Sequence, residues 1–251
     1  MTTIKTKEEI EIMREAGRRL ALVLEDLKKA VRPGIKTMEL NRLAESLISK
    51  QKGTPCFKGY DDFPAAICTS VNDEIVHAVP SARVLKEGDI LTIDAGLRYK
   101  GYDSDMAFTL PVGKANPEAL RLLRVTKKAL KRGVKKVRPG NTVGDLGNAI
   151  QRYVESQGFS IIKDLCGHGI GKELQEDPKI LNYGKRGEGE ELKEGMVICI
   201  EPIVSMGDGT MKEGDDGFSF VTGDGSLSAH FEHMMAITSK GARVLTEIKS
   251  S

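Results

Sequence analysis

Two short motifs occur twice in the chain at nearly the same spacing, and this repetition constrains the fold more than any other feature. Val-Arg-Pro-Gly at 31–34 recurs at 137–140, and Leu-Lys-Glu-Gly at 85–88 recurs at 192–195, so the offsets are 106 and 107 residues. This period is far longer than the roughly 20–50 residues of solenoid repeats. The repetition predicts a single domain, residues 1–251, built from two related halves about a pseudo-two-fold axis.

Each half is expected to begin with two helices. Thr6 and Glu9 form a capping box at the start of the first helix. Asn116 is a capping residue before Pro117, which suits the first position of the third helix. We predict four helices, at about 7–31, 37–52, 117–136 and 142–157.

Apolar segments typical of strands follow the helices in both halves, which extend over about 1–110 and 111–251. The segments are 90–93 in the first half and 197–200 in the second. Helices followed by antiparallel strands, in duplicate, indicate an α+β fold. We expect two sheets that join in a central antiparallel sheet, with helices covering one side.

Both of these strands end in an acid, at the offset of the repeat. Asp94 follows the first strand and Glu201 follows the second. A carboxylate buried in a strand is costly unless it is paired or binds a metal ion. A hairpin turn near 99–100 is expected to bring a further acid, Asp105, roughly opposite Asp94.

A fourth acid and one histidine complete the candidate site. In the segment 228–235, which we expect to be one strand, alternation places Glu232 on the same face as His230 and Phe231 on the other. His168 lies between two glycines in the sequence CGHGIG. Glycine allows a close approach of backbone, so we expect these glycines to let backbone lie near His168 and an incoming substrate.

The combined charge of these residues indicates two divalent metal ions. Four carboxylates carry four negative charges, which two such ions would neutralise. A metal pair bridged by carboxylates and a hydroxide is a common hydrolytic centre. Oxygen ligands with one imidazole suit Mn, Fe, Co or Zn. Taken singly, an acid such as Asp94 or Glu232 is more often part of a capped turn or a surface salt bridge.

These residues resemble the metal centre of a type I methionine aminopeptidase, a family with the pita-bread fold. The resemblance extends over nearly the whole chain. It is carried by SVNDEIVHAVP at 70–80, LKEGDILTIDAG at 85–96, DSDMAF at 103–108, CGHGIGKELQEDP at 166–178, LKEGMVICIEP at 192–202 and SLSAHFEH at 226–233. It implies a monomeric metalloaminopeptidase that removes the N-terminal methionine of nascent proteins and peptides with a metal-bound hydroxide.

The resemblance also implies residue roles. Asp105 and Glu232 bridge the metal pair, Glu201 shuttles a proton, and His77 contacts the scissile amide. Five residues are the metal ligands: Asp94, Asp105, His168, Glu201 and Glu232. An apolar pocket for the methionine side chain is expected from Tyr60, Phe63, Cys68, Leu174 and Phe218.

Three positions depart from the family pattern. Leu174 stands where an aromatic residue is common, and Phe218 stands where tryptophan is common, so the pocket stays apolar but changes shape. Gln175 stands where the family has a second histidine that contacts the substrate. Glutamine can donate a hydrogen bond to a carbonyl oxygen but cannot be protonated near neutral pH. We predict a catalytic, substrate-orienting role with reduced turnover; the alternative is a solvated loop glutamine.

Two other functions fit the same fold. One is a proline-specific peptidase, although those enzymes usually carry an additional N-terminal domain. The other is a binding protein that has lost catalysis, although such relatives typically lose metal ligands and this chain keeps all five.

Composition places the chain among soluble globular proteins, with 39% hydrophobic and 29% charged residues. No apolar run approaches the roughly 20 residues of a membrane span, and the polar N-terminus has no signal core. We therefore predict a cytoplasmic protein without membrane contact. Its four cysteines are expected to be free thiols: Cys56, Cys68, Cys166 and Cys199.

One segment is strongly basic, although the net charge is only +2. Residues 121–138 contain nine lysines and arginines and no acid. The segment is either a solvated helix face or a contact surface for RNA, for example at a ribosome. No aromatic residue interrupts it, so base stacking has no support.

Overall fold

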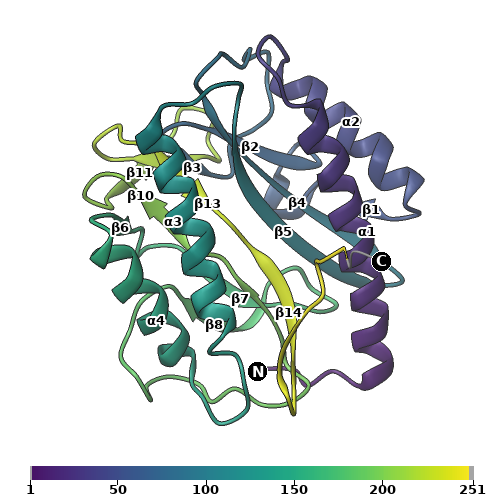
Figure 1. The fold of residues 1–251 in the computed structure, drawn as a ribbon. Coiled ribbons are helices and arrows are strands. Elements are labelled where there is room, and N and C mark those ends of the chain that lie inside the picture. Colours follow the sequence, from purple (N-terminus) through teal and green to yellow (C-terminus); the bar gives the residue numbers. More distant parts are fainter. Residues whose placement is uncertain (1, 249–251) are drawn as a thin grey trace.

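The computed structural model describes residues 2–248, and its helices occur in two pairs that cover one side of the strands (Figure 1). The helices are α1 (Lys7–Ala30), α2 (Thr37–Lys50), α3 (Pro117–Val134) and α4 (Val143–Ser156). As predicted, Thr6 and Glu9 form a capping box on α1, and the Asn116 side chain accepts a hydrogen bond from the Ala119 N–H at 2.8 Å.

The strands among the described residues pair antiparallel and form two larger and two smaller sheets. The first larger sheet contains β1 (Thr54–Pro55), β2 (Ile67–Val71), β4 (Ile90–Tyr99) and β5 (Tyr102–Pro111). The second contains β7 (Cys166–Gly169), β8 (Glu176–Leu181), β9 (Val197–Ile200), β14 (His233–Thr238) and β15 (Gly241–Val244). The smaller sheets are β6 (Ser160–Ile161), β10 (Ile203–Ser205) and β13 (Ser228–His230), and β3 (Glu74–Val76), β11 (Met211–Glu213) and β12 (Phe220–Thr222).

The repeated motifs occupy equivalent positions in the two halves. Gly34 and Gly140, which end the two Val-Arg-Pro-Gly copies, have φ of 89° and 84°, a conformation that favours glycine. The Gly34 N–H donates to Leu85 O at 2.8 Å, and the Gly140 N–H donates to Leu192 O at 3.2 Å. Each turn thus contacts the Leu-Lys-Glu-Gly copy of its own half, so the repeated sequence marks a repeated structure.

The β4–β5 hairpin brings two of the predicted acids together with a register that differs from the expectation. Lys100 and Gly101 form the turn, with φ of 51° and 82°, as in the tight turns that match strand twist. Asp105 lies opposite Gly96, and Asp94 lies opposite Ala107. The two acids are therefore diagonal rather than opposite, but they share one face because side chains alternate along a strand.

The single strand expected over 228–235 is instead interrupted at residues 231–232. The Phe231 N–H donates to Pro202 O at 3.4 Å, and the Glu232 N–H donates to Ala107 O at 2.9 Å. These two residues therefore pair with other segments and not with a strand neighbour in one sheet. The second contact is where the segment before β14 meets β5, so the two larger sheets approach each other there.

Each helix pair packs on its own apolar core. Buried residues of α1 and α2 form one cluster with β2 and β4. Buried residues of α3 and α4 form another with β9, β10 and β14. In Figure 1, α1 and α3 stand on either side of β5 and β14. No helix within residues 2–248 combines the length and apolar character of a membrane span.

Candidate active site

The structure brings all the predicted site residues together around one cleft of about 420 Å³. The side chains come from elements far apart in the sequence, so the fold and not local sequence creates the site. The predicted residues that line it are Tyr60, Phe63, Cys68, His77, Asp94, Asp105, His168, Leu174, Gln175, Glu201, Phe218 and Glu232.

Three carboxylates at the base of the cleft are buried and crowded. Asp94, Asp105 and Glu232 are 9%, 5% and 2% exposed, and each offers an oxygen within 4.8 Å of the others'. One oxygen of each of these carboxylates has no hydrogen-bond partner among the described residues. Burying an unpaired carboxylate costs free energy. A bound cation or protonation of these groups would therefore stabilise the arrangement.

Burial and mutual repulsion raise the pKa of the carboxyl groups at this centre. Burial raises the pKa of Asp94 to about 7, and its contact with Asp105 opposes part of this rise. Burial, together with Glu232 and Asp94, raises the pKa of Asp105 well above its usual range. Burial also raises the pKa of Glu201 and of Glu232. A divalent cation among these groups would favour their charged forms.

His168 has the orientation and protonation state of a metal ligand. Its Nδ1–H donates to Gly169 O at 2.9 Å, which leaves Nε2 as the free lone pair. Nε2 lies 3.8 Å from Asp105 Oδ2 and 3.7 Å from Glu201 Oε1. Burial lowers the pKa of His168, so the ring is neutral near pH 7.

The glycines on either side of His168 allow backbone to lie close, as expected, and that backbone belongs to neighbouring strands. A Cβ on Gly167 would lie 2.3 Å from Cys199 O, and one on Gly169 would lie 2.1 Å from Asp177 O. Both contacts are with backbone of neighbouring strands, β9 and β8. The glycines are therefore needed because the strands that flank β7 pack directly against its backbone.

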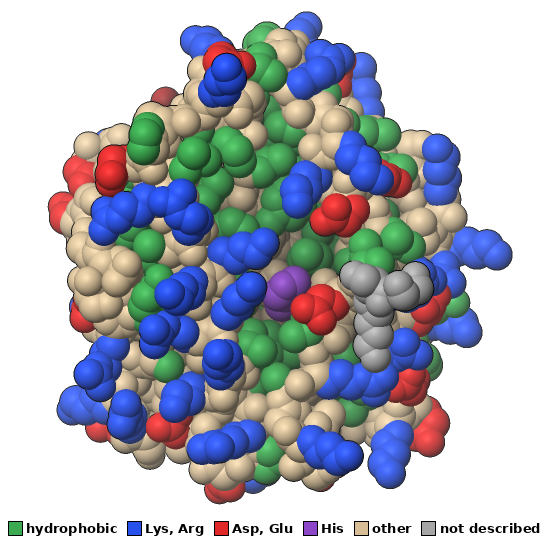
Figure 2. Space-filling view, viewed as in Figure 1, with side chains coloured by type: hydrophobic (Ala, Val, Ile, Leu, Met, Phe, Trp, Pro, Cys, Tyr) green, Lys and Arg blue, Asp and Glu red, His purple; other side chains and the backbone are tan. Residues whose placement is uncertain are grey.

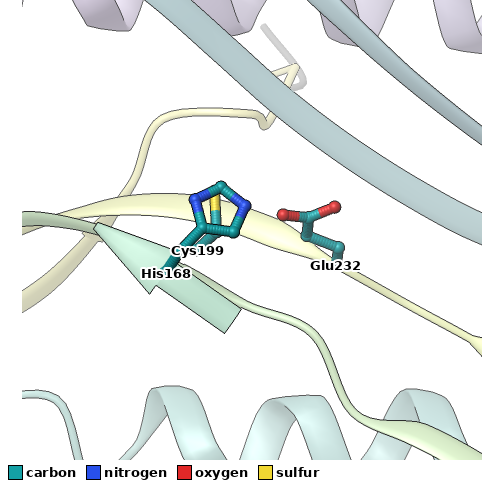
Figure 3. Close-up of side chains that lie close together, drawn as sticks. All are labelled: His168, Cys199 and Glu232. Carbon is teal, nitrogen blue, oxygen red and sulfur yellow. The ribbon is translucent and has the colours of Figure 1, made fainter. Parts of the chain in front are cut away.

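Two residues beside the centre were not predicted as site residues. Cys199 offers its sulfur within 4.8 Å of ligand atoms of His168 and Glu232, and Figure 3 shows the imidazole and the carboxylate facing each other with the sulfur beside the ring. His230 Nε2 lies 3.5 Å from Glu201 Oε2. The sequence could have identified Cys199 as a site residue. It precedes Glu201 by two residues, and side chains two apart along extended backbone point to the same side.

His77 reaches the cleft from strained backbone. Its φ is 60°, which is uncommon for a residue other than glycine and is often found at functional sites. Its ring lies 6.1 Å from that of Phe220, centroid to centroid. Desolvation lowers the pKa of His77, so the neutral ring can donate one hydrogen bond.

The predicted pocket residues form an apolar part of the cleft wall. Phe63 and Phe218 pack edge to face with centroids 5.5 Å apart. Cys68 and Leu174 are buried, whereas Tyr60 is 37% exposed. The cysteines form no disulfide in the described residues, as expected.

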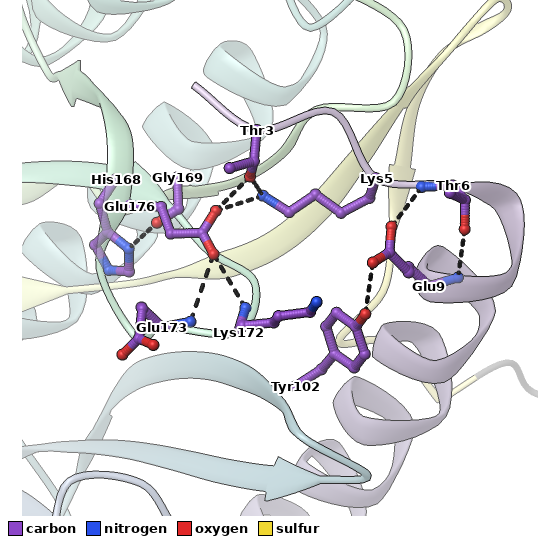
Figure 4. Close-up of polar contacts among 10 residues, drawn as sticks. All are labelled: Thr3, Lys5, Thr6, Glu9, Tyr102, His168, Gly169, Lys172, Glu173 and Glu176. Carbon is purple, nitrogen blue, oxygen red and sulfur yellow. Dashed lines mark hydrogen bonds and ion pairs between the residues drawn. The ribbon is translucent and has the colours of Figure 1, made fainter. Parts of the chain in front are cut away.

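The loop that carries Leu174 and Gln175 is held from its far end by Glu176 (Figure 4). One Glu176 oxygen accepts from the Lys172 N–H at 3.0 Å, and the other accepts from Lys5 Nζ at 2.6 Å. Gln175 is exposed and lines the cleft. The N-terminal segment thus fixes a loop that borders the substrate cleft.

The chain matches the family model described as Metallopeptidase family M24 over residues 11–239. It is 47% identical to methionine aminopeptidase 1 of Bacillus subtilis over 248 residues, which covers 99% of this chain and 100% of that protein. The crystal structure of methionine aminopeptidase from Thermotoga maritima matches with a TM-score of 0.97 and 43% identity, over 99% of this chain and 100% of that one.

A more distant match concerns proline-specific enzymes. Prolidase from Pyrococcus furiosus matches with a TM-score of 0.79 and 27% identity. The match covers 98% of this chain but only 66% of the prolidase chain. The shared region is therefore the fold around the cleft, and a third of that enzyme lies outside it.

Proposed function

Because the chain belongs to metallopeptidase family M24, as a type I methionine aminopeptidase that removes N-terminal methionine, we propose that the four cleft carboxylates and His168 bind its metal ions. The donor set comprises Asp94, Asp105, His168, Glu201 and Glu232. Its charge matches two divalent ions, of Co, Mn, Fe or Zn. The observation that carries the proposal is the group of buried carboxylate oxygens that lack hydrogen-bond partners among the described residues.

The bound ions would supply Lewis acidity, which polarises a carbonyl and lowers the pKa of water. Asp94, Asp105 and Glu232, whose ligand oxygens lie within 4.8 Å of one another, would hold the ions together. His168 is held by the Gly169 carbonyl in the tautomer that leaves Nε2 free. Such a partner on the second ring nitrogen fixes the orientation of a ligating histidine.

Glu201 is the proposed proton shuttle of the reaction. Burial and the nearby Asp94 and Asp105 carboxylates raise the pKa of Glu201, and a divalent cation beside it would favour the charged form that accepts a proton. His230 Nε2 lies 3.5 Å from the Glu201 carboxylate. Glu201 can thus accept a proton at a carboxylate oxygen and return it to the leaving amine.

His77 and Gln175 are proposed to orient the peptide bond that is cleaved. Both line the cleft, and both carry N–H groups that can donate to a peptide carbonyl. A neutral His77 can stabilise charge that develops on the carbonyl oxygen. Gln175 can share this role without supplying a proton.

The apolar wall is proposed to bind the methionine side chain. A thioether packs well against aromatic rings and adapts to irregular space. Phe63 and Phe218 provide the rings, and Tyr60, Cys68 and Leu174 complete the pocket. The free N-terminal amine of the peptide would lie at the charged base of the cleft, which selects chain ends.

The test is hydrolysis of short peptides by protein loaded with Co, Mn or Fe(II). We expect free methionine from Met-Ala-Ser and no cleavage of Xaa-Pro peptides. Cleavage only before proline would support the proline-specific alternative. Two bound ions per chain without hydrolysis of either peptide would support a binding protein that has lost catalysis.

The remaining predictions from the sequence concern organisation and location. A single catalytic domain of residues 1–251, a monomeric state and a cytoplasmic location stay predictions. Contact of the basic segment 121–138 with a ribosome also stays a prediction.

A further inference from the structure

A groove of about 990 Å³ lies between α1 and α3, on the helix-covered side of β5 and β14. Figure 2 shows hydrophobic side chains along the groove and a concentration of lysines and arginines beside it. Most of the floor is apolar, and His233 also lines it. Met106, Phe108, Leu110 and Leu120 are each only partly buried, so a continuous apolar surface remains open to solvent.

Four cations from α3 and its C-terminal cap follow one rim of this groove, and we call them the α3 stripe. The stripe consists of Arg124, Lys127, Lys131 and Lys135, all exposed and all lining the groove. Within residues 2–248 these four side chains form no salt bridge, hydrogen bond or ring contact. Lys128 and Arg132, on the neighbouring face of α3, instead stack on Tyr153 of α4 at 5.4 and 4.4 Å. The basic segment therefore contains cations that contact other side chains of the fold and cations that contact none among the described residues.

The rest of the rim does not neutralise the stripe. Glu25 and Glu247 also line the groove, but Glu25 lies 3.9 Å from Lys28. The groove therefore has a net positive rim around an apolar floor. Its chemical complement is a segment with an apolar face and an adjacent row of acids.

We propose that this groove binds an acidic amphipathic helix of a partner protein. The partner would lie between α1 and α3 and complete the helical layer, with apolar side chains on the floor and carboxylates against the α3 stripe. The stripe has spacings of three, four and four residues, which is about 16 Å along a helix. Acids with the same spacing on the partner would face the four cations, as in other helix-in-groove complexes.

The floor favours a protein partner over RNA. RNA binding relies on phosphate contacts and on aromatic side chains that stack with bases. The floor is instead largely aliphatic and recessed between two helices, which suits a helix face. The stripe alone would serve either partner, so the apolar floor decides between them.

The groove also contacts the segment that carries a proposed metal ligand. Phe231, Glu232 and His233 line it, and Glu232 lines the cleft as well. A bound partner would therefore lie against the segment that carries Glu232. This makes the groove a neighbour of the active site without giving the α3 stripe any part in catalysis.

The probe for the test is a synthetic peptide of about 18 residues, with glutamates at the spacing of the stripe and leucines on the adjacent helix face. We expect fluorescence anisotropy to show binding to the wild-type protein. Lys127→Glu with Lys131→Glu should weaken binding by about tenfold or more, because the mutant opposes the peptide's charge. Lys128→Glu with Arg132→Glu, the matched control on the same helix, should change it by less than about twofold.

Two further binding measurements separate the contribution of the apolar floor from that of the charges. A peptide with serine in place of each leucine should bind about tenfold more weakly, and Leu120→Gln should weaken binding of the original peptide without any change of charge. Equal weakening by both double mutants, or equal binding of the serine peptide, would overturn the proposal. Tighter binding of a single-stranded RNA, lost in the Lys127→Glu, Lys131→Glu protein, would identify a nucleic-acid surface and also overturn it. So would self-association that this mutant abolishes in sedimentation.

Discussion

The cleft and the groove share Glu232 in their linings, but their charged side chains differ in burial. In the cleft, carboxylates such as Asp94 and Asp105 are buried and lack partners for some of their oxygens. In the groove, the cations of the α3 stripe are exposed and solvated. Buried unpaired charge is costly, whereas exposed charge costs little. The cleft therefore needs bound cations or protons to offset its charge, while the groove can remain empty.

The largest effect is expected from removal of a cleft carboxylate. Asp94→Ala or Glu232→Ala should lower kcat/KM for Met-Ala-Ser by about a thousandfold or more, because metal charge stabilisation is worth several kcal/mol. Bound metal, measured by elemental analysis, should fall as well. Glu247→Ala, which removes an acid from the groove, is the matched control and should change neither quantity by more than about twofold. Wild-type rates from Asp94→Ala would contradict the metal assignment.

Removal of the metal ions should make stability depend on pH. The folded-state pKa of Asp94 is about 7, above its unfolded value of about 3.9. The stabilisation from its protonated form is complete below the unfolded pKa and is lost as pH rises through about 7. The Tm of the metal-free protein should therefore fall by about 5 °C or more between pH 5 and pH 8.

The metal-loaded protein is the control for this pH effect. Bound ions neutralise the carboxylates, so its Tm should change much less over the same range. Asp94→Asn should reduce the slope of the metal-free protein. A metal-free Tm that rises with pH would show that the cleft carboxylates are not the groups that titrate.

A smaller effect is expected at Gln175, on the exposed side of the cleft. Gln175→His should raise kcat for Met-Ala-Ser by roughly tenfold, because a histidine adds proton transfer to the hydrogen bond that glutamine can donate. Gln175→Ala should lower kcat, since it removes the donor. The role assigned to this position is wrong if the histidine variant turns over no faster than wild type.

The smallest effect on activity is expected from substitution of Lys5, which is paired with an acid, and we compare it with the unpaired Lys127. Lys5 Nζ lies 2.6 Å from Glu176 Oε2, and the Lys5 side chain is 5% exposed. Lys5→Met should loosen the loop of residues 171–176, raise KM by about threefold and speed its hydrogen exchange. Lys127→Met, which removes an unpaired groove cation, should leave both unchanged. Equal effects of the two substitutions would remove the distinction between these lysines.

Local sequence rules predicted the helices and the grouping of the acids well. The capping residues Thr6 and Asn116 fixed two helix starts because their hydrogen bonds are made within one turn. The internal repeat pointed to both Asp94 and Glu201, but the expectation that each follows a strand was wrong for Asp94. Asp94 lies inside β4, whereas Glu201 directly follows β9. The resemblance then placed pocket residues from several elements around one cleft.

Features that depend on contacts between distant segments were not predicted. The strand that contains Glu232 is interrupted because its N–H bonds to Ala107, which is far away in the sequence. Gly167 and Gly169 are required by the backbone of the flanking strands, which no local pattern reveals. The groove depends on the gap between α1 and α3, so the sequence showed its basic residues but not its apolar floor.

The most direct test of the metal centre is anomalous diffraction from crystals soaked in Mn(II) or Co(II). We expect two anomalous peaks in the cleft, bounded by Asp94, Asp105, His168, Glu201 and Glu232, and their loss in crystals of the Asp94→Ala protein. Peaks at other positions, or a cleft without peaks in crystals that bind metal elsewhere, would contradict the assignment of these five residues.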